Sequence, residues 1–300
     1  MRQMLFLLWP VGLLLVGCVL ALFDRRDIGD LGPLVLAFVF GAVGAGFWGW
    51  RALDFFAFRQ GKDVFALANL PLAVWALLVT LLFARWPWAE TPLDFTWVGM
   101  AAGSGVSFGM ALPQALGQAQ LEFWLVAAGP VLGSWGATIW GWNFYSPRRG
   151  QRFGAFLVAP LVSWGIATTV IWLERRFPNL LAGSLALVSL LLLAVAVGMV
   201  LEARELKAQL AEEAGFGLLP WAAVEACAKW HRRLGKTLAS RRSERRALAR
   251  VLVRLAALKA YLASRRKNNS AASVELGKLR EWVKRAFSPP GNGGELLPFA

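Results

Sequence analysis

The chain has 300 residues, of which 57% are hydrophobic and 16 are tryptophan, and its formal net charge is +14. Its two cysteines, Cys18 and Cys227, are too few and too far apart to give a disulfide framework. The lone histidine, His231, cannot build an intramembrane metal site by itself.

Seven long apolar stretches precede a strongly basic, polar region that begins at about residue 203. Each stretch has about the 20 residues that a helix needs to cross a hydrocarbon layer about 30 Å thick. Seven of them would need a soluble core larger than a chain of this length can enclose. We therefore predict an all-α polytopic membrane protein with about seven transmembrane helices, at Met4–Phe23, Leu31–Ala52, Val64–Ala84, Phe95–Leu116, Leu121–Phe144, Phe153–Leu173 and Leu180–Leu201.

The fourth stretch differs from the others because it is rich in glycine and serine and contains Pro113. These residues disfavour a regular helix, so we expect this span to be broken or shortened. The same small residues also permit close packing between helices.

Polar side chains are scarce in the predicted spans, and ionisable ones are nearly absent. We expect Asp94 and Glu122 to lie at span ends, where water can reach them. The polar residues either form hydrogen bonds between helices or line a polar cavity. We define the candidate polar groove as Asn69, Asp94, Gln114, Glu122, Ser134, Thr138 and Asn143. We predict no catalytic residue, metal site or cofactor.

The region after residue 203 is predicted to be a cytoplasmic helical tail over 204–288, with a mobile C-terminus over 289–300. Residues 201–300 hold 20 of the 32 basic and 9 of the 18 acidic residues, a net charge of +11. Basic segments resist translocation, which predicts an inner (plasma) membrane protein with a cytoplasmic C-terminus. We expect helices at Glu202–Ala214 and Ala222–Ala239, separated by Gly215, Gly217 and Pro220.

Two further tail helices are expected, an amphipathic one from Ser243 and a short one over Ser273–Phe287. We predict that basic side chains of the tail face anionic lipid headgroups, whereas docking onto a protein is an alternative. Nucleic acid is not expected, because no recognised motif accompanies the charge. The predicted lipid-facing residues are Arg245, Arg246, Arg250, Arg254, Lys259 and Arg265.

Several motifs in order along the chain resemble the PrsW family of bacterial intramembrane proteases, which is related to the CAAX-protease and bacteriocin-processing type. The charged turn Phe23–Asp27 followed by LVLAFVFGAVGAG (34–46) looks like the opening of that family. Asp94 with Gly99, Gly103 and Gly105 falls where the family has an Asp and a glycine-laced span. GPVLGSWGATIWG (129–141) falls where the family has a His and, four residues on, a Thr.

The functional residues that the resemblance implies are missing from the matching positions. With Pro71 as the reference, the paired glutamates of the family become Val74 and Trp75, and the lysine becomes Leu78. The first histidine becomes Ser134, with Thr138 retained, and the second falls near Thr169 or Val170. Intramembrane hydrolysis needs a group that activates water and a group that stabilises the oxyanion. The resemblance therefore implies a PrsW-like fold without the family's chemistry.

We interpret the chain as a non-catalytic PrsW-like homologue, a pseudoenzyme that binds a single-span membrane partner or acts in membrane signalling. An active protease with relocated catalytic residues is the first alternative. Ser104, Ser107 and Ser134 lie in glycine-rich runs, but a serine dyad would need an intramembrane histidine. A small-solute transporter is the second alternative, which the lack of inverted repeats and buried charges disfavours.

Overall fold

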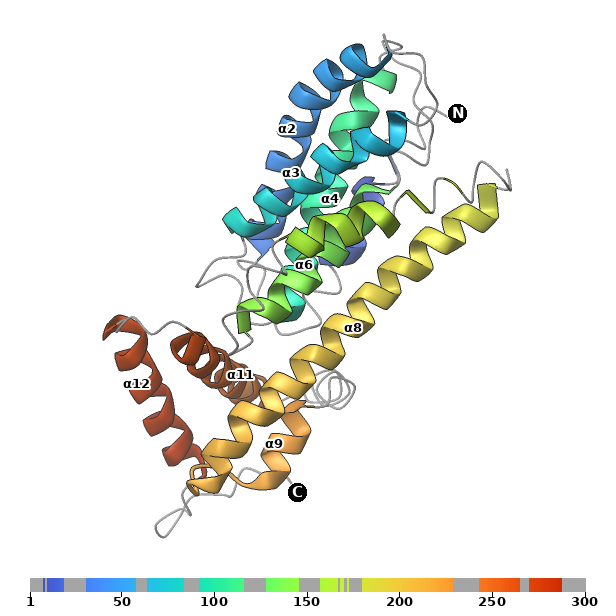
Figure 1. Cartoon of the computed structure of the whole chain (residues 1–300). Coiled ribbons are helices and arrows are strands. Elements are labelled where there is room, and N and C mark those ends of the chain that lie inside the picture. The colour runs from blue at the N-terminus through green and yellow to red at the C-terminus, as the bar shows by residue number, and fades with distance from the viewer. Residues whose placement is uncertain are drawn as a thin grey trace. The chain divides into compact units, whose positions relative to one another are not determined.

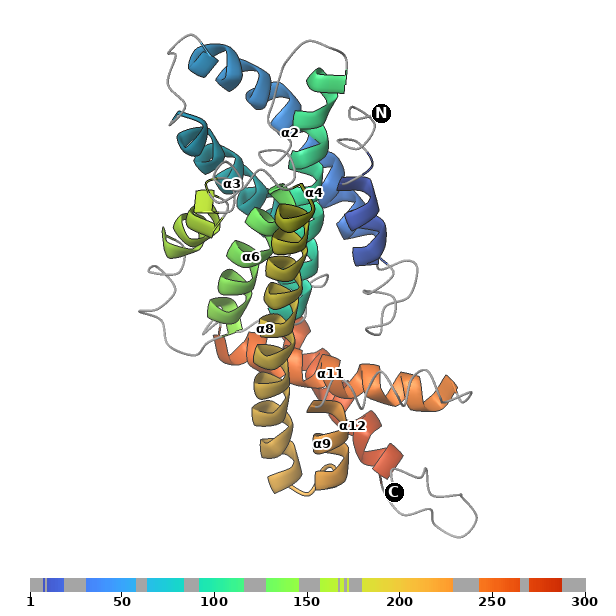
Figure 2. The same ribbon diagram turned by 90° about the vertical axis from the view of Figure 1, so that its right-hand side faces the viewer.

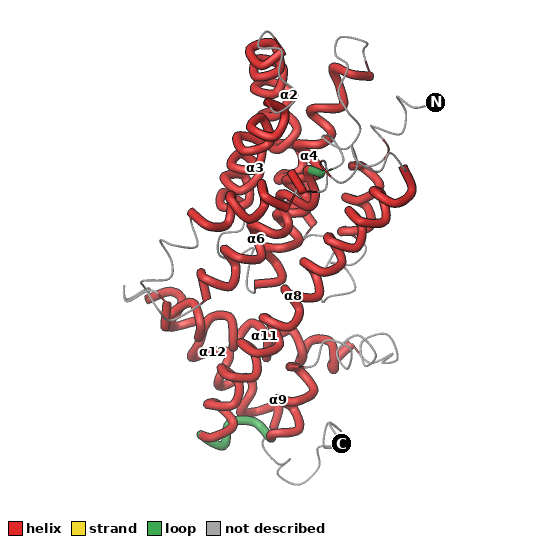
Figure 3. The backbone as a smooth tube through the Cα atoms, turned by 45° about the vertical axis from the view of Figure 1, so that its right-hand side comes forward, coloured by secondary structure: helices red, strands yellow, loops and turns green. Residues whose placement is uncertain are grey.

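The computed structural model describes residues 8, 10–18, 31–57, 64–83, 92–115, 128–145, 157–166, 168–169, 172, 180–228, 243–264 and 270–287. Within these residues the chain is all-helical, as predicted, and Figure 3 shows no strand. The principal helices are α2 (Gly32–Ala57), α3 (Val64–Phe83), α4 (Pro92–Ala115), α6 (Gly129–Tyr145), α8 (Leu180–Gly215), α9 (Trp221–Ala228), α11 (Ser243–Ser264) and α12 (Ser270–Phe287).

Two compact units make up the chain. The first comprises Met1–Phe144 and Arg148–Gly198, and the second comprises Tyr145–Pro147 and Met199–Ala300. Helix α8 contributes to both units, because it continues without a break from the apolar Leu180 to the polar Gly215. The change in composition near residue 203 is therefore not a change in secondary structure.

Among the residues that the structure describes, two helices are long and apolar enough to cross a membrane, Leu93–Leu112 and Leu185–Gly215. The first is 89% buried, which is also typical of a core helix in a soluble protein, and the second is 33% buried. Three shorter apolar helices occur at Gly32–Phe47, Pro71–Phe83 and Leu157–Ile166. The first, fifth and sixth predicted spans each lie partly outside the described residues, so the count of seven stays a prediction.

Helix α4 lies at the centre of the first unit. Helices α2 and α3 pack against it, and Figure 1 shows α2, α3 and α4 side by side. The expected break in this span is wrong, since α4 is continuous through 24 residues. Pro92 opens the helix and Asp94 lies in its first turn, which are both favourable starting signals. The glycines do not interrupt α4 because each allows a neighbouring backbone to approach.

Helix α4 meets α6 and α2 through two separate rows of glycine. A Cβ atom on Gly103 would overlap the carbonyl oxygen of Gly129, and one on Gly133 would overlap that of Gly99. On the other row, a Cβ atom on Gly105 would overlap the carbonyl oxygen of Phe38 in α2. Backbones this close gain dispersion contacts that larger side chains would prevent.

The second unit consists of the end of α8 with α9, α11 and α12. Helix α8 ends where Leu218 N–H donates to the Glu213 carbonyl (3.1 Å) and Gly217 N–H donates to the Ala214 carbonyl (2.9 Å). This closure needs a left-handed residue, and Gly217 supplies it with φ of 73°. Figure 2 shows the short turn that then brings α9 back beside α8. The expected breakers therefore end α8, and helix 222–239 is described to Ala228.

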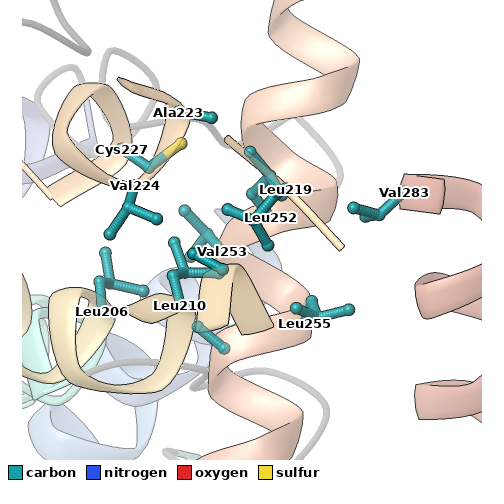
Figure 4. Close-up of a cluster of buried hydrophobic side chains, with 12 residues drawn as sticks. Leu206, Leu210, Leu219, Ala223, Val224, Cys227, Leu252, Val253, Leu255 and Val283 are labelled. Atoms are coloured by element: carbon teal, nitrogen blue, oxygen red, sulfur yellow. The ribbon is translucent and has the colours of Figure 1, made fainter. Parts of the chain in front are cut away.

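An apolar core holds these four helices together. Figure 4 shows Leu206 and Leu210 of α8 facing Val224 of α9 and the leucines of α11. Val283 joins this core from α12. The tail is therefore a packed unit, in which the apolar face of α11 is buried against other tail helices.

Candidate functional site

Most of the buried polar residues described in the first unit belong to α4 and α6. Ser134 and Thr138 in α6 and Asp94 and Thr96 in α4 are all at most 2% exposed. Two of the candidate groove residues, Ser134 and Thr138, are thus on one stretch of α6, and Thr96 was not predicted. Its partner Thr138 is 42 positions away along the chain, so no local sequence pattern indicated Thr96.

A chain of hydroxyl hydrogen bonds connects the two helices. Thr138 Oγ1 donates to the Ser134 carbonyl at 2.7 Å and lies 2.8 Å from Thr96 Oγ1. A hydroxyl has one proton, so Thr96 is the donor toward Thr138 when Thr138 donates to the carbonyl. Ser134 Oγ donates to the Val131 carbonyl at 3.2 Å. These hydroxyls therefore join helices and hold backbone carbonyls, which is the structural role of such groups in membrane interiors.

Asp94 is 2% exposed, so the expectation that water reaches it is wrong. The helix start places it where the aligned N–H groups of the first turn favour a carboxylate. The structure places Asn69 in α3, Gln114 in α4 and Asn143 in α6, but it does not describe their side chains. Glu122 lies outside the described residues.

The α3 positions to which the predicted resemblance assigns the glutamates and the lysine do not join this polar region. Val74 is 38% exposed and Leu78 is 45% exposed, whereas Ala73 and Leu77 on the adjoining face are buried. Trp75 turns toward α2, where its indole N–H donates to the Phe40 carbonyl at 3.3 Å. Its ring occupies the space beside Gly44.

The position expected for the second histidine forms a hydrogen bond within its own helix. Thr169, near the second histidine position, donates to the Gly165 carbonyl at 2.8 Å. The structure thus places Val74 and Leu78 on an outward face and Ser134 and Thr138 in a helix contact. No group of three or more His, Cys, Asp or Glu side chains that could hold a metal ion occurs in the part of the chain that the structure describes.

In the tail, a buried carboxylate forms ion pairs with two cationic side chains from two other helices. Glu213 of α8 has a side chain that is 0% exposed. Arg280 of α12 donates from Nε to Oε2 at 3.0 Å and from Nη2 to Oε1 at 2.6 Å. Lys259 of α11 approaches Oε1 at 2.9 Å. We call Glu213, Lys259 and Arg280 the tail ion cluster.

Opposing effects act on the Glu213 pKa. Burial raises that pKa, but the hydrogen bonds and charges of Arg280 and Lys259 together lower it more, so the net pKa lies below its ordinary value. The hydrogen bond to Glu213 also raises the pKa of Arg280. Glu213 is therefore ionised at neutral pH and ties α8 to α11 and α12.

Lys259 was predicted to face lipid, and this is wrong. Its side chain is 14% exposed, and it binds Glu212 at 2.6 Å and the Gln209 carbonyl at 3.2 Å in addition to Glu213. Arg254 binds Glu275 of α12 at 2.6 Å. Arg245, Arg246 and Arg250 are in α11 without described side chains, and Arg265 lies outside the described residues.

Comparisons of the chain with protein-family models, with curated proteins and with solved structures found no match.

Proposed function

We propose that this chain is a multi-pass helical protein of the inner (plasma) membrane, with a PrsW-like core and a cytoplasmic tail, which binds a single-span membrane partner without catalysing its cleavage. The placement of apolar and small side chains in the first unit supports this proposal best. Large apolar side chains are exposed on several helices, while glycines and hydroxyl-bearing side chains lie between helices, beside buried aromatic ones such as Phe95 and Trp97.

The outward apolar side chains form stripes on several helices. Val43 and Phe47 of α2 are 68% and 67% exposed, and Leu192 of α8 is 59% exposed. Single exposed apolar residues are ordinary in soluble proteins, but a stripe along successive turns is costly in water, at about 1.5–3 kcal/mol for each large side chain. Hydrocarbon removes that cost. The outward residues of α2 are Val35, Leu36, Val39, Phe40, Val43 and Phe47.

The inward residues complement this pattern. Water is not available to drive helices together inside a bilayer, so close backbone packing and hydroxyl hydrogen bonds provide the attraction. The glycine rows of α4 and the Thr96–Thr138 hydrogen bond are interactions of that kind.

The non-catalytic part of the proposal rests on α3. If the family alignment at Pro71 holds, the positions for activating water carry Val74 and Leu78, whose alkyl side chains cannot transfer a proton. They form an outward apolar face together with Leu82, which is 48% exposed. This face suits the apolar side chains of a partner's transmembrane helix, and the proposed partner lies there.

One observation favours an active protease instead. Asp94 is a buried carboxylate in the first turn of α4, and a buried carboxylate can act as a general base. The D94N variant tests this reading directly.

The experiment has two readouts on the full chain. Alkaline carbonate should leave the chain in the membrane pellet, and its release into the supernatant would refute the membrane proposal. The second readout uses the chain in bilayers, with a photoreactive group placed near position 78. This group should crosslink to a single-span protein that an active PrsW-like protease cleaves, and the chain should leave that protein uncleaved. Cleavage that D94N abolishes would establish the protease alternative.

A further inference from the structure

The outer face of α12 combines exposed apolar and cationic side chains. We propose that this face docks onto an anionic lipid surface; this rests on the proposed function, in which the tail is tethered to a membrane by α8. The surface consists of Val274, Lys278, Trp282 and Arg285, which we call the outer stripe.

Helix periodicity places these four residues together. They follow one another at intervals of four, four and three positions, and all four are exposed. Val274 is 58% exposed and Trp282 is 43% exposed. The opposite face of α12 carries Leu276, Leu279 and Val283, which pack on the tail core. The outer stripe is therefore directed away from that core.

Helix α11 is less suited to contact lipid, although it holds more basic residues. Its apolar side chains Leu252, Val253 and Leu255 are buried in the tail core. Its cations Arg254 and Lys259 bind Glu275 and the tail ion cluster. An amphipathic helix binds a bilayer with its apolar face, and α11 uses that face inside the protein.

The chemistry of the outer stripe matches a headgroup layer. Indole prefers the boundary between lipid and water, and cations beside it attract anionic headgroups. Two carboxylates adjoin the stripe. Glu275 is paired with Arg254 of α11 at 2.6 Å, and Glu281 lies 3.6 Å from Arg285, where the two side chains are 74% and 82% exposed. An exposed pair at this distance leaves the guanidinium accessible to phosphate. Nucleic acid or an acidic protein would contact the cations of the stripe, whereas a bilayer would also bury the apolar side chains of Val274 and Trp282.

The test uses the full chain in lipid nanodiscs, with an environment-sensitive fluorophore attached at S273C after C18A and C227A. Ser273 is exposed and adjoins the stripe without belonging to it. In phosphatidylglycerol discs, the label should be protected from acrylamide, a neutral quencher. In phosphatidylcholine discs it should remain accessible, and about 1 M salt should restore access in phosphatidylglycerol, since it shortens the screening length to about 3 Å.

Variants locate the contact. K278E should weaken docking about five-fold or more, from the loss of one favourable cation. Its matched control is K207E, at an exposed lysine on α8 that follows the span closely. W282S should also weaken docking, whereas F216S should not, although Phe216 is 77% exposed.

Each remaining outcome contradicts the proposal. Equal quenching in both lipids would show that the stripe does not dock. An effect of K207E as large as that of K278E would show that net charge, and not this face, attracts the lipid. Carbonate extraction tests membrane insertion separately. If carbonate releases the chain, acrylamide quenching of the same label is measured for the released chain with phosphatidylglycerol vesicles.

Discussion

Individual glycines in the first unit allow helices to pack closely because they have no side chain. Gly103 shows this best, because the atom that a Cβ would meet is a backbone carbonyl, which cannot rotate aside as a flexible side chain would. By contrast, nothing lies within 4 Å of a Cβ built at Gly165. The two helical glycines therefore provide a matched pair.

We predict that G103A destabilises the protein by about 1–3 kcal/mol, because the helices must separate to admit the methyl group. G165A should be neutral or stabilising by up to about 1 kcal/mol, since alanine is the better helix former. Thermal unfolding in detergent compares the two. Equal midpoints would show that α4 and α6 are not in close contact.

The Thr96–Thr138 hydrogen bond gives a second residue-level prediction. T138V should cost about 0.5–1 kcal/mol more than T80V, because Thr80 donates only to the Ala76 carbonyl of its own helix, at 2.7 Å. A double-mutant cycle with T96V measures the coupling. Strict additivity of the two changes would contradict the interhelical bond.

At the scale of the element, the tail helices depend on one another through charge. Glu213 is held by residues from α11 and α12, and 67 positions separate it from Arg280. E213Q should destabilise the tail by about 1–3 kcal/mol, because it leaves the partly buried Arg280 without its carboxylate and leaves Lys259 with only the more exposed Glu212. E281Q, at an exposed pair, should change stability by less than about 0.5 kcal/mol. Hydrogen exchange in α11 and α12 reports the difference, and similar exchange in both variants would oppose the assigned role of the cluster.

The lowered Glu213 pKa also predicts the pH dependence of the tail. A carboxyl whose folded pKa is below its unfolded value stabilises the fold above the unfolded pKa, which is about 4.5. That stabilisation is lost as pH falls through the folded pKa. Acid should therefore loosen the tail of the wild type, while E213Q should lack this part of the transition. Identical acid transitions by circular dichroism would disagree with the shift.

The elements were more predictable than their contacts. The all-α class follows from the apolar stretches, and the end of α8 follows from Gly215, Gly217 and Pro220. The continuity of α4 was missed because glycine and Pro113 were judged by their effect on an isolated helix. Lys259 was misassigned for a similar reason: its helix shows a basic face, but the buried partner Glu213 belongs to another helix. Long-range pairing of this kind has no local pattern.

At the scale of the whole molecule, charge predicts orientation. The net +11 of residues 201–300 should keep the C-terminus in the cytoplasm. Alkaline phosphatase is active only outside the inner membrane, so a fusion after Ala300 should be inactive there. A fluorescent protein that folds in the cytoplasm should be bright at the same position. The reverse pair of results would invert the proposed topology.

The glycine contacts of α4 also bear on how relatives of this chain would diverge. In the proposed membrane setting, outward apolar positions can exchange leucine, valine and phenylalanine freely, because lipid accepts each of them. Positions 99, 103, 105, 129 and 133 admit almost no side chain, since backbone atoms already fill the space. Relatives would thus keep the spacing of their smallest residues while most larger ones drift. A search that scores that spacing should find them sooner than one that scores overall similarity.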